Sequence, residues 1–168
     1  MGTTGGARLA PVIMHGLRGR MVTTFEGHGG KAQEYAIKNQ WAVLPIHSIK
    51  NGLCTCGRGD CSSPGKHPRT VNGLTDATRD QAVISGWWEQ WPDANIGVRT
   101  GRISGIIAID LDIKNAASGG NGVTNWYDLE DIHGRVNTMT ARTGSGGQHW
   151  IYKLPDNVEV RNDAGTKL

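Results

Sequence analysis

The chain has 168 residues, of which 37% are hydrophobic and 20% are charged; this excludes a charged disordered protein and suits one domain with a single core. Its longest apolar runs, such as residues 106–109, are far shorter than the roughly 20 residues that span a bilayer, so a membrane protein is excluded as well. The formal net charge is only +3, which gives no strong overall field for nucleic acid, so any site for a polyanion must be local.

Residues 1–30 are predicted to be a flexible, glycine-rich N-terminal tail. Eight of them are glycine and no hydrophobic periodicity persists, which is the composition of a flexible linker. Arg8 and His15 flank the only early apolar patch, at residues 10–14, so no secretory signal is visible. We therefore expect a cytoplasmic protein with one domain over residues 31–168.

The first part of this domain predicts two helices and two strands around an irregular segment. The helices are expected at residues 31–40 and 79–90, and the strands at residues 41–46 and 95–100. The second helix has two plausible N-cap residues, Asp76 and Thr78. Four side chains near this helix are expected to face the core: Ala82, Val83, Trp87 and Trp91.

The second part predicts three strands and one helix. The strands are expected at residues 106–113, 137–142 and 148–154, and the helix at residues 123–132, ended by Gly134. Helices and strands mix without a regular βαβ repeat, which favours an α+β fold.

Two aspartates share one face of the strand predicted at residues 106–113. Because side chains alternate along a strand, Asp110 and Asp112 project together with Cα atoms roughly 6.6 Å apart. Two like charges this close on a mostly buried strand repel each other and lose solvation, unless a divalent cation neutralises them. The same spacing suits a pair of metal ions in phosphoryl transfer. The alternative is that both aspartates close a strand end and face water.

A glycine loop, residues 143–147, leads into the last predicted strand. Its three glycines allow backbone N–H groups to approach an anion closely. It is not a Walker loop, because it leads into a strand instead of a helix. Trp150 and Tyr152 are expected to face the core, which leaves His149 on the opposite face, where it can donate to a triphosphate. The alternative is a hairpin loop with a structural histidine.

A third cluster, which we call the Cys/His loop, occupies residues 51–69. It contains four soft or borderline metal ligands, Cys54, Cys56, Cys61 and His67. Four such ligands suit a tetrahedral, structural zinc ion, and a metal would stabilise a loop that has little core of its own. An odd number of cysteines without a secretory signal argues against a disulfide framework. The alternative is three reduced, unligated cysteines.

These motifs occur together, in order, in one known family. They are WAVLPI at residues 41–46, CTCGRGDCSSPGKHP at 54–68, DATRD at 76–80, WWEQWPDANIG at 87–97, IDLD at 109–112 and SGGQH at 145–149. Over residues 31–165 the chain resembles the N-terminal domain of bifunctional DNA primase–polymerases of phages and plasmids, in the archaeo-eukaryotic primase superfamily.

The resemblance implies an RRM-like catalytic sheet with flanking helices and the Cys/His loop inserted. The implied activity is template-directed synthesis from nucleoside triphosphates on single-stranded DNA during phage or plasmid replication. In this family the acidic motif, here Asp110 and Asp112, would hold Mg²⁺ or Mn²⁺. The histidine motif, here His149, would contact the phosphates of the incoming nucleotide.

Three further groups of contacts are expected around these residues. The superfamily often has a serine where this chain has Gly147, so hydroxyl help would come from Ser145, beside Gly146 in the glycine loop. Arg142 is a candidate for the triphosphate charge, by its chemistry more than by motif. The Cys/His loop would be a platform near template or primer, with Arg58, Lys66 and Arg69 as phosphate contacts.

The chain departs from the family pattern in one respect, and two other functions compete with that of a primase–polymerase. Relatives carry a third acidic motif after a segment like residues 158–162, so the domain is expected to stop before that motif. A non-catalytic nucleic-acid or nucleotide-binding zinc module is therefore the alternative function, and a helicase domain or protein is a possible partner. A D-x-D glycosyltransferase is disfavoured, because neither the Cys/His loop nor the SGGQH motif is expected there.

Overall fold

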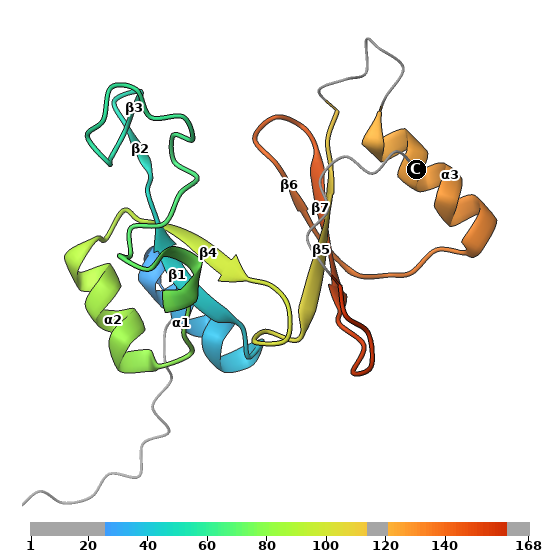
Figure 1. Ribbon diagram of the computed structural model, residues 1–168, viewed down its shortest axis with the longest axis horizontal. Helices are drawn as coiled ribbons and strands as arrows, with labels where there is room; N and C mark the ends of the chain where they lie inside the picture. The colour runs from blue at the N-terminus through green and yellow to red at the C-terminus, as the bar shows by residue number, and fades with distance from the viewer. Residues whose placement is uncertain (1–25, 114–120, 161–168) are drawn as a thin grey trace, which may run out of the picture.

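The computed structural model describes residues 26–113 and 121–160. Figure 1 shows these residues as two lobes side by side, joined at the base. The N-terminal lobe comprises residues 26–104, and the C-terminal lobe comprises residues 105–113 and 121–160. Among the described helices, none is long and apolar enough to cross a membrane.

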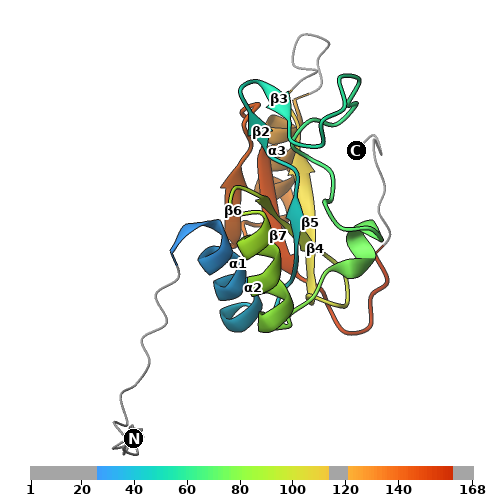
Figure 2. The ribbon, with the colours of Figure 1, turned by 90° about the vertical axis from the view of Figure 1, so that its left-hand side faces the viewer.

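The N-terminal lobe is built on an antiparallel pair of strands, β1 (Ala42–Ile46) and β4 (Asn95–Arg99). Two helices, α1 (Gly27–Lys38) and α2 (Gln81–Gln90), lie side by side against this pair, as Figure 2 shows. The core between them consists of Ala32, Ala36, Val43, Ile84, Trp88 and Ala94, all 6% exposed or less. A second small core, around Leu44 and Ala77, lies on the other face of β1.

Helix α1 begins earlier than the sequence predicts. It starts at Gly27, so the predicted tail is wrong for residues 27–30, while residues 1–25 lie outside the described residues. One glycine of this segment is required by packing, since a Cβ at Gly29 would lie 2.8 Å from Cβ of Trp88. Gly29 thus allows α1 to approach α2 closely.

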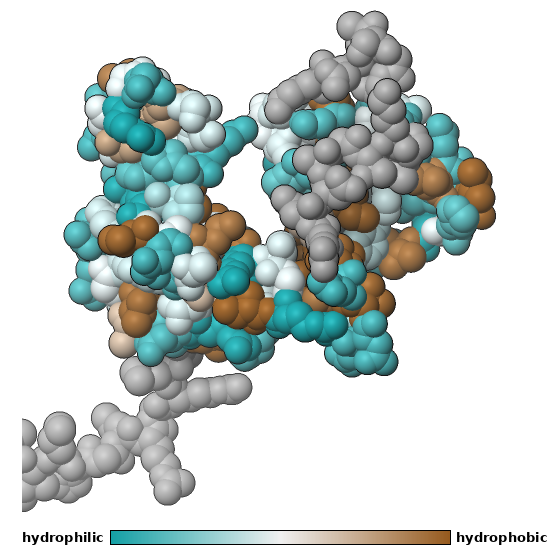
Figure 3. Space-filling model, viewed as in Figure 1, coloured by the Kyte–Doolittle hydropathy of each residue, from teal (hydrophilic) through white to brown (hydrophobic). Residues whose placement is uncertain are grey.

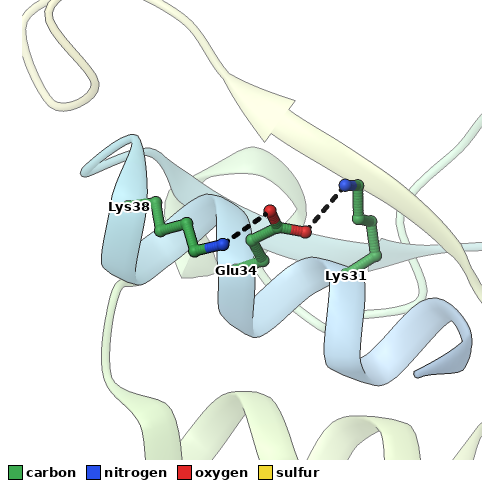
Figure 4. Close-up of polar contacts among 3 residues, drawn as sticks. All are labelled: Lys31, Glu34 and Lys38. Carbon is green, nitrogen blue, oxygen red and sulfur yellow. Dashed lines mark hydrogen bonds and ion pairs between the residues drawn. The ribbon is translucent and has the colours of Figure 1, made fainter. Parts of the chain in front are cut away.

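The exposed face of α1 carries a short network of ion pairs. Figure 4 shows Glu34 between two lysines, with Lys31 Nζ at 2.7 Å and Lys38 Nζ at 3.2 Å from its carboxylate oxygens. The hydrogen bond from Lys31 is the main cause of the lowered pKa of Glu34. Ion pairs between side chains three or four residues apart stabilise a helix in this way. The opposite face of α1 carries the buried residues Ala32 and Ala36.

Helix α2 differs from the prediction in its N-cap residue and in the side chains that it buries. Its N-cap is Asp80, whose Oδ1 accepts from the N–H groups of Ala82 at 2.8 Å and Val83 at 3.2 Å, not Asp76 or Thr78. Ile84 and Trp88, one turn apart, are its buried residues. The predicted inward positions of Ala82 and Val83 are wrong, since both are exposed, while Trp87 and Trp91 are partly buried.

The C-terminal lobe is a three-stranded antiparallel sheet covered on one face by a helix. The strands are β5 (Ile106–Leu111), β6 (Met139–Arg142) and β7 (Gln148–Lys153), in the order β5-β7-β6. Helix α3 (Gly122–His133) is capped by Asn121, and Gly134 follows with φ of 90°. The Trp126 ring of α3 packs against Trp150 and Tyr152, with centroids 5.8 and 6.1 Å away.

The predicted α+β class is confirmed, with all predicted helices and strands present to within a few residues. An isolated antiparallel bridge pairs Gly101, just after the β1–β4 pair, with Ile106, the first residue of β5 in the three-stranded sheet. An RRM-like single sheet is not established by this arrangement and stays a prediction.

Candidate functional site

The four predicted zinc ligands meet at one point of the Cys/His loop. The sulfur atoms of Cys54, Cys56 and Cys61 and a ring nitrogen of His67 all lie within 4.8 Å of one another. Nε2 of His67 is 3.5 Å from the sulfur atoms of both Cys54 and Cys61. Tetrahedral zinc, with bonds of about 2.3 Å to sulfur and 2.0–2.1 Å to nitrogen, requires edges of about 3.5–3.8 Å. The group can therefore bind a metal such as zinc.

A β-hairpin at the top of the N-terminal lobe brings Cys54 to this point (Figure 1). Its strands are β2 (Ile49–Lys50) and β3 (Leu53–Cys54). The turn residues Asn51 and Gly52 have φ of 52° and 78°, the left-handed backbone that makes Asn-Gly a favoured two-residue hairpin turn. The composition of this segment predicts an irregular loop, although its Asn-Gly pair is the signal that could have identified the hairpin.

The thiols of the cluster differ in acidity. The Gly65 N–H donates to Cys54 Sγ at 3.4 Å and is the main cause that lowers the pKa of Cys54 to about 6. The Arg58 N–H is the main cause of the lowered pKa of Cys56, whereas burial raises the pKa of Cys61. Because the thiolate is the form that binds metal, Cys54 is prepared to act as a ligand at neutral pH.

A hydrogen-bond network centred on Thr55 supports the Cys/His cluster on the side of His47. No sequence motif pointed to Thr55. The Thr55 hydroxyl oxygen accepts from the Ser48 N–H at 3.0 Å and from the Arg69 guanidinium at 2.7 Å. These donors use both acceptor positions, so the hydroxyl donates to Nδ1 of His47, 3.0 Å away. His47 is thereby held neutral, in agreement with a pKa that burial lowers, and its ring packs 4.4 Å from the His67 ring.

The three basic residues predicted to contact DNA are in different environments. Besides donating to Thr55, the Arg69 guanidinium lies 5.6 Å from the centre of the Trp91 ring, so Arg69 supports the loop itself. Arg58 and Lys66 are exposed. These two side chains are available to a phosphate, and Arg69 is already engaged.

Asp110 and Asp112 project from the predicted face of the strand. Both are exposed, while Ile107, Ile109 and Leu111 are partly or fully buried. The expected environment is wrong in one respect, because the Asp110 side chain is 63% exposed. Helix α3 packs on the opposite face of the sheet, where Trp150 lies. Among the described helices, α3 thus packs on the face of the sheet away from the two aspartates.

His149 is the cross-strand neighbour of Asp110. The register of β5 and β7 pairs the two residues directly, and His149 Nε2 lies 3.4 Å from Asp110 Oδ1. His149 is 47% exposed, on the face opposite Trp150, as the sequence predicts. The acidic motif and the histidine motif are thus adjacent in the sheet.

The glycine loop is a tight turn packed against β5. The Thr143 N–H donates to the Gly147 carbonyl at 2.9 Å, and the Gly146 N–H to the Thr143 carbonyl at 3.0 Å. A Cβ at Gly147 would lie 2.5 Å from the Leu111 carbonyl oxygen. This contact favours glycine at position 147, since any side chain on this backbone would clash with β5.

A cleft of about 710 Å³ brings these features together. We call it the carboxylate cleft; its lining residues are Lys66, Asp110, Asp112, Thr143, Gly144, Ser145 and His149. They come from both lobes, and Figure 3 shows the molecule hollowed between the lobes. The cleft thus has two carboxylates and a histidine on one wall and a lysine of the Cys/His loop on another.

Arg142 is not part of this cleft. In the register of β6 and β7, Ala141 pairs with His149 and Arg142 pairs with Gln148, so Arg142 projects to the opposite face of the sheet from His149. There it lines a separate cavity of about 550 Å³, beside Trp150. Its position does not support the expected contact with a triphosphate at the aspartates.

Comparison with known families agrees with the motifs in and around the cleft. Residues 32–168 match the family described as the N-terminal domain of bifunctional DNA primase/polymerase, Prim-Pol. The chain belongs to the Prim-Pol family. The match includes the Cys/His loop and every residue of the carboxylate cleft, so the resemblance stated from the sequence is confirmed.

Membership in the Prim-Pol family indicates a DNA primase/polymerase-type function. It implies nucleotidyl transfer as the class of reaction, with DNA and nucleotides as the substrates. No curated protein and no solved structure matches the chain.

Proposed function

We propose that this Prim-Pol domain carries out template-directed nucleotidyl transfer from nucleoside triphosphates on single-stranded DNA, with a divalent cation held by Asp110 and Asp112. The observation that carries the proposal is the cross-strand pair of Asp110 and His149 inside the carboxylate cleft. A carboxylate site for a cation and a donor for phosphate oxygens then lie side by side, as phosphoryl transfer requires.

Each wall of the cleft has a proposed task. Asp110 and Asp112 supply the oxygen ligands that Mg²⁺ and Mn²⁺ prefer. The bound cation would favour activation of the attacking 3′-hydroxyl and neutralise charge on the leaving pyrophosphate. His149 Nε2, at the edge of the same carboxylate, would donate to a phosphate oxygen of the nucleotide.

The glycine loop is proposed to bind phosphate through its backbone. Gly144 and Ser145 line the cleft, and within the described residues nothing accepts a hydrogen bond from either N–H. The Gly146 N–H is already used by Thr143, which makes Gly146 a residue that shapes the turn. Free N–H groups on a glycine-rich turn are suited to an anion, and the Ser145 hydroxyl adds a further donor.

The Cys/His loop is proposed to hold a structural zinc ion and to contact the template. Four protein side chains converge there, enough to fill a tetrahedral site, and a zinc ion held by all four would have no open position for catalysis. Arg58, on the exposed part of the loop, is the proposed contact to the DNA backbone. Arg69 would act only indirectly, by supporting the loop.

The proposal is tested by oligonucleotide synthesis on a single-stranded DNA template with labelled nucleotides and Mn²⁺. We expect Asp110→Asn and Asp112→Asn to reduce product by about 100-fold or more, because the metal supplies several kcal/mol of transition-state stabilisation. Asp128→Asn, an exposed carboxylate of α3 outside the cleft, is the matched control. Synthesis by Asp110→Asn at the rate of the unchanged chain would overturn the proposal.

Nucleotide binding measured in parallel separates catalysis from binding alone. If the chain binds deoxynucleoside triphosphates through Asp110 but makes no product, the non-catalytic binding module becomes the better description. If neither binding nor synthesis depends on Asp110, the carboxylate cleft is not the nucleotide site.

A further inference from the structure

We infer that Lys66 of the Cys/His loop binds the triphosphate of the incoming nucleotide at the carboxylate cleft, so that occupancy of the Cys/His site by zinc sets the affinity for nucleotide. The inference rests on the proposed function and assigns a cation to the same site. It differs from the sequence prediction, in which Lys66 contacts the DNA backbone.

The charge balance of the cleft favours a cation of this kind. A divalent cation held by Asp110 and Asp112 would balance the two carboxylates, and a triphosphate then brings several further negative charges to the same wall. Arg142, the residue expected to offset this charge, projects to the other face of the sheet. Among the described lining residues, Lys66 is the one with a permanent positive charge, and an ammonium binds phosphate as a compact point charge.

The Lys66 side chain is free to do so. It is exposed, and its ammonium has no hydrogen-bond or ion-pair partner within residues 26–113 and 121–160. The exposed Gly144 and Ser145 line the same cleft from the other lobe. A triphosphate between the lobes could therefore be bound from both sides.

The backbone at Lys66 is fixed by the metal cluster. On one side, the Gly65 N–H donates to Cys54 Sγ at 3.4 Å. On the other side, His67 is itself one of the four candidate metal ligands, and its carbonyl accepts from the His47 N–H at 2.9 Å. Lys66 thus lies between two residues whose positions depend on the Cys/His site, and loss of zinc would release the lysine from the cleft.

A third contact ties this segment to the sheet of the N-terminal lobe. Asn95 Nδ2 donates to the carbonyl oxygens of His47 at 3.1 Å and Gly65 at 3.2 Å. The lysine is therefore carried on a segment anchored by both a metal site and a strand. This makes a precise position in the cleft feasible for a residue of an irregular loop.

The first experiment measures the affinity of the chain for dATP with Mn²⁺ by calorimetry. We expect Lys66→Ala to weaken binding about tenfold or more, the size of a charge-assisted contact to phosphate, and Lys66→Arg to restore most of it. Lys50→Ala is the matched control, since Lys50 is an exposed lysine of β2, next to the Cys/His loop and outside the cleft. Unchanged affinity in Lys66→Ala would overturn the inference.

The second experiment tests the coupling to zinc. We expect Cys61→Ser to lower both zinc content and dATP affinity, and Lys66→Ala to cause no further loss in the Cys61→Ser background. Because Cys61→Ser could also impair folding, the unchanged chain is stripped of zinc, separated from chelator and reloaded. Affinity that falls and returns with zinc supports the coupling, and affinity independent of zinc overturns it.

The outcomes separate this inference from the proposed function. If Asp110→Asn abolishes dATP binding while Lys66→Ala does not affect it, the proposed function stands and the inference fails. If Lys66→Ala weakens binding of a single-stranded oligonucleotide and leaves dATP binding unchanged, Lys66 contacts nucleic acid instead. If neither Asp110→Asn nor Lys66→Ala affects dATP binding, both proposals fail.

Discussion

His149 Nε2 lies 3.4 Å from Asp110 Oδ1, and the two residues are directly opposed on neighbouring strands. Sheet register alone therefore connects the acidic motif and the histidine motif, without any contribution from a flexible segment. Gly147, directly before β7, makes the closest backbone approach to β5 at this end of the sheet, since a Cβ there would lie 2.5 Å from the Leu111 carbonyl oxygen.

The first prediction concerns Gly147. A Cβ there would lie 2.5 Å from the Leu111 carbonyl oxygen, which is backbone and cannot move aside. We expect Gly147→Ala to destabilise the fold by about 1–3 kcal/mol, as overpacking commonly does, and to displace His149 from Asp110. Urea unfolding measures the first effect, and dATP affinity measures the second.

Gly144→Ala is the control for this prediction. Nothing lies within 4 Å of the Cβ that would be added at Gly144, so its free energy of unfolding should change by no more than about 0.5 kcal/mol. Equal destabilisation by the two substitutions would show that the close approach of Gly147 to β5 is not what the loop requires.

Much of the C-terminal lobe was predictable because its pattern is local. The apolar run from Ile106 predicts the strand, and the alternation of apolar and acidic residues from Ile109 to Asp112 predicts its two faces. The same argument places His149 opposite Trp150. Which strands pair could not be predicted, because the register of Asp110 with His149 depends on contacts between segments far apart in sequence.

The structure departs from the expectations where contacts between distant segments outweigh the conformation that the local sequence favours. Glycines at the start of α1 have the composition of a tail, but Gly29 is required by its contact with Trp88. The side of the sheet on which Arg142 projects, opposite to His149, could not be foreseen from its chemistry, because it depends on the register of β6 with β7. Lys66 could not be placed in the cleft from sequence, because the fold brings it to the cleft from the other lobe.

The second prediction concerns the acidity of the cysteines in the zinc-free protein. The Gly65 N–H lowers the pKa of Cys54 to about 6, whereas burial raises the pKa of Cys61 above its ordinary value of 9.0. Only the thiolate reacts with iodoacetamide. We expect the alkylation rate of Cys54 to rise with a midpoint near pH 6 and that of Cys61 to rise above pH 9.

Peptide mass spectrometry between pH 5 and pH 10 follows both cysteines in the same sample, so Cys61 is the internal control. Since each profile is normalised to its own maximum, differences in access to the reagent cancel. Zinc should suppress alkylation at both positions. Coincident profiles in the zinc-free chain would show that the Gly65 N–H does not act on Cys54 as the structure indicates.

The third prediction concerns Arg58 and the template. If Arg58 neutralises one DNA phosphate, Arg58→Ala should reduce the slope of log affinity against log salt by about 0.7, the value for one contact to a single strand. Arg79→Ala, an exposed arginine at the start of the α2 segment, should leave the slope unchanged. Equal slopes for Arg58→Ala and the unchanged chain would remove Arg58 from the template contacts.

The last prediction concerns Asn95, the residue that joins β4 to the Cys/His loop. Its side-chain amide donates to the carbonyl oxygens of His47 and Gly65, so Asn95→Ala leaves two partly buried acceptors without their donor. We expect a loss of about 1–3 kcal/mol in the free energy of unfolding, from the cost of such unsatisfied groups. Zinc should also dissociate faster, because Gly65 supplies the N–H that stabilises the Cys54 thiolate.

Urea unfolding measures the loss of stability in Asn95→Ala, and transfer of zinc to excess chromogenic chelator measures its dissociation. Asn125→Ala is the control, because Asn125 is exposed on α3, away from the loop. The two readouts distinguish a general from a specific effect. Reduced stability with unchanged zinc dissociation would mean that Asn95 supports β4 alone, and the segment carrying Lys66 would then depend on the metal cluster without help from the sheet.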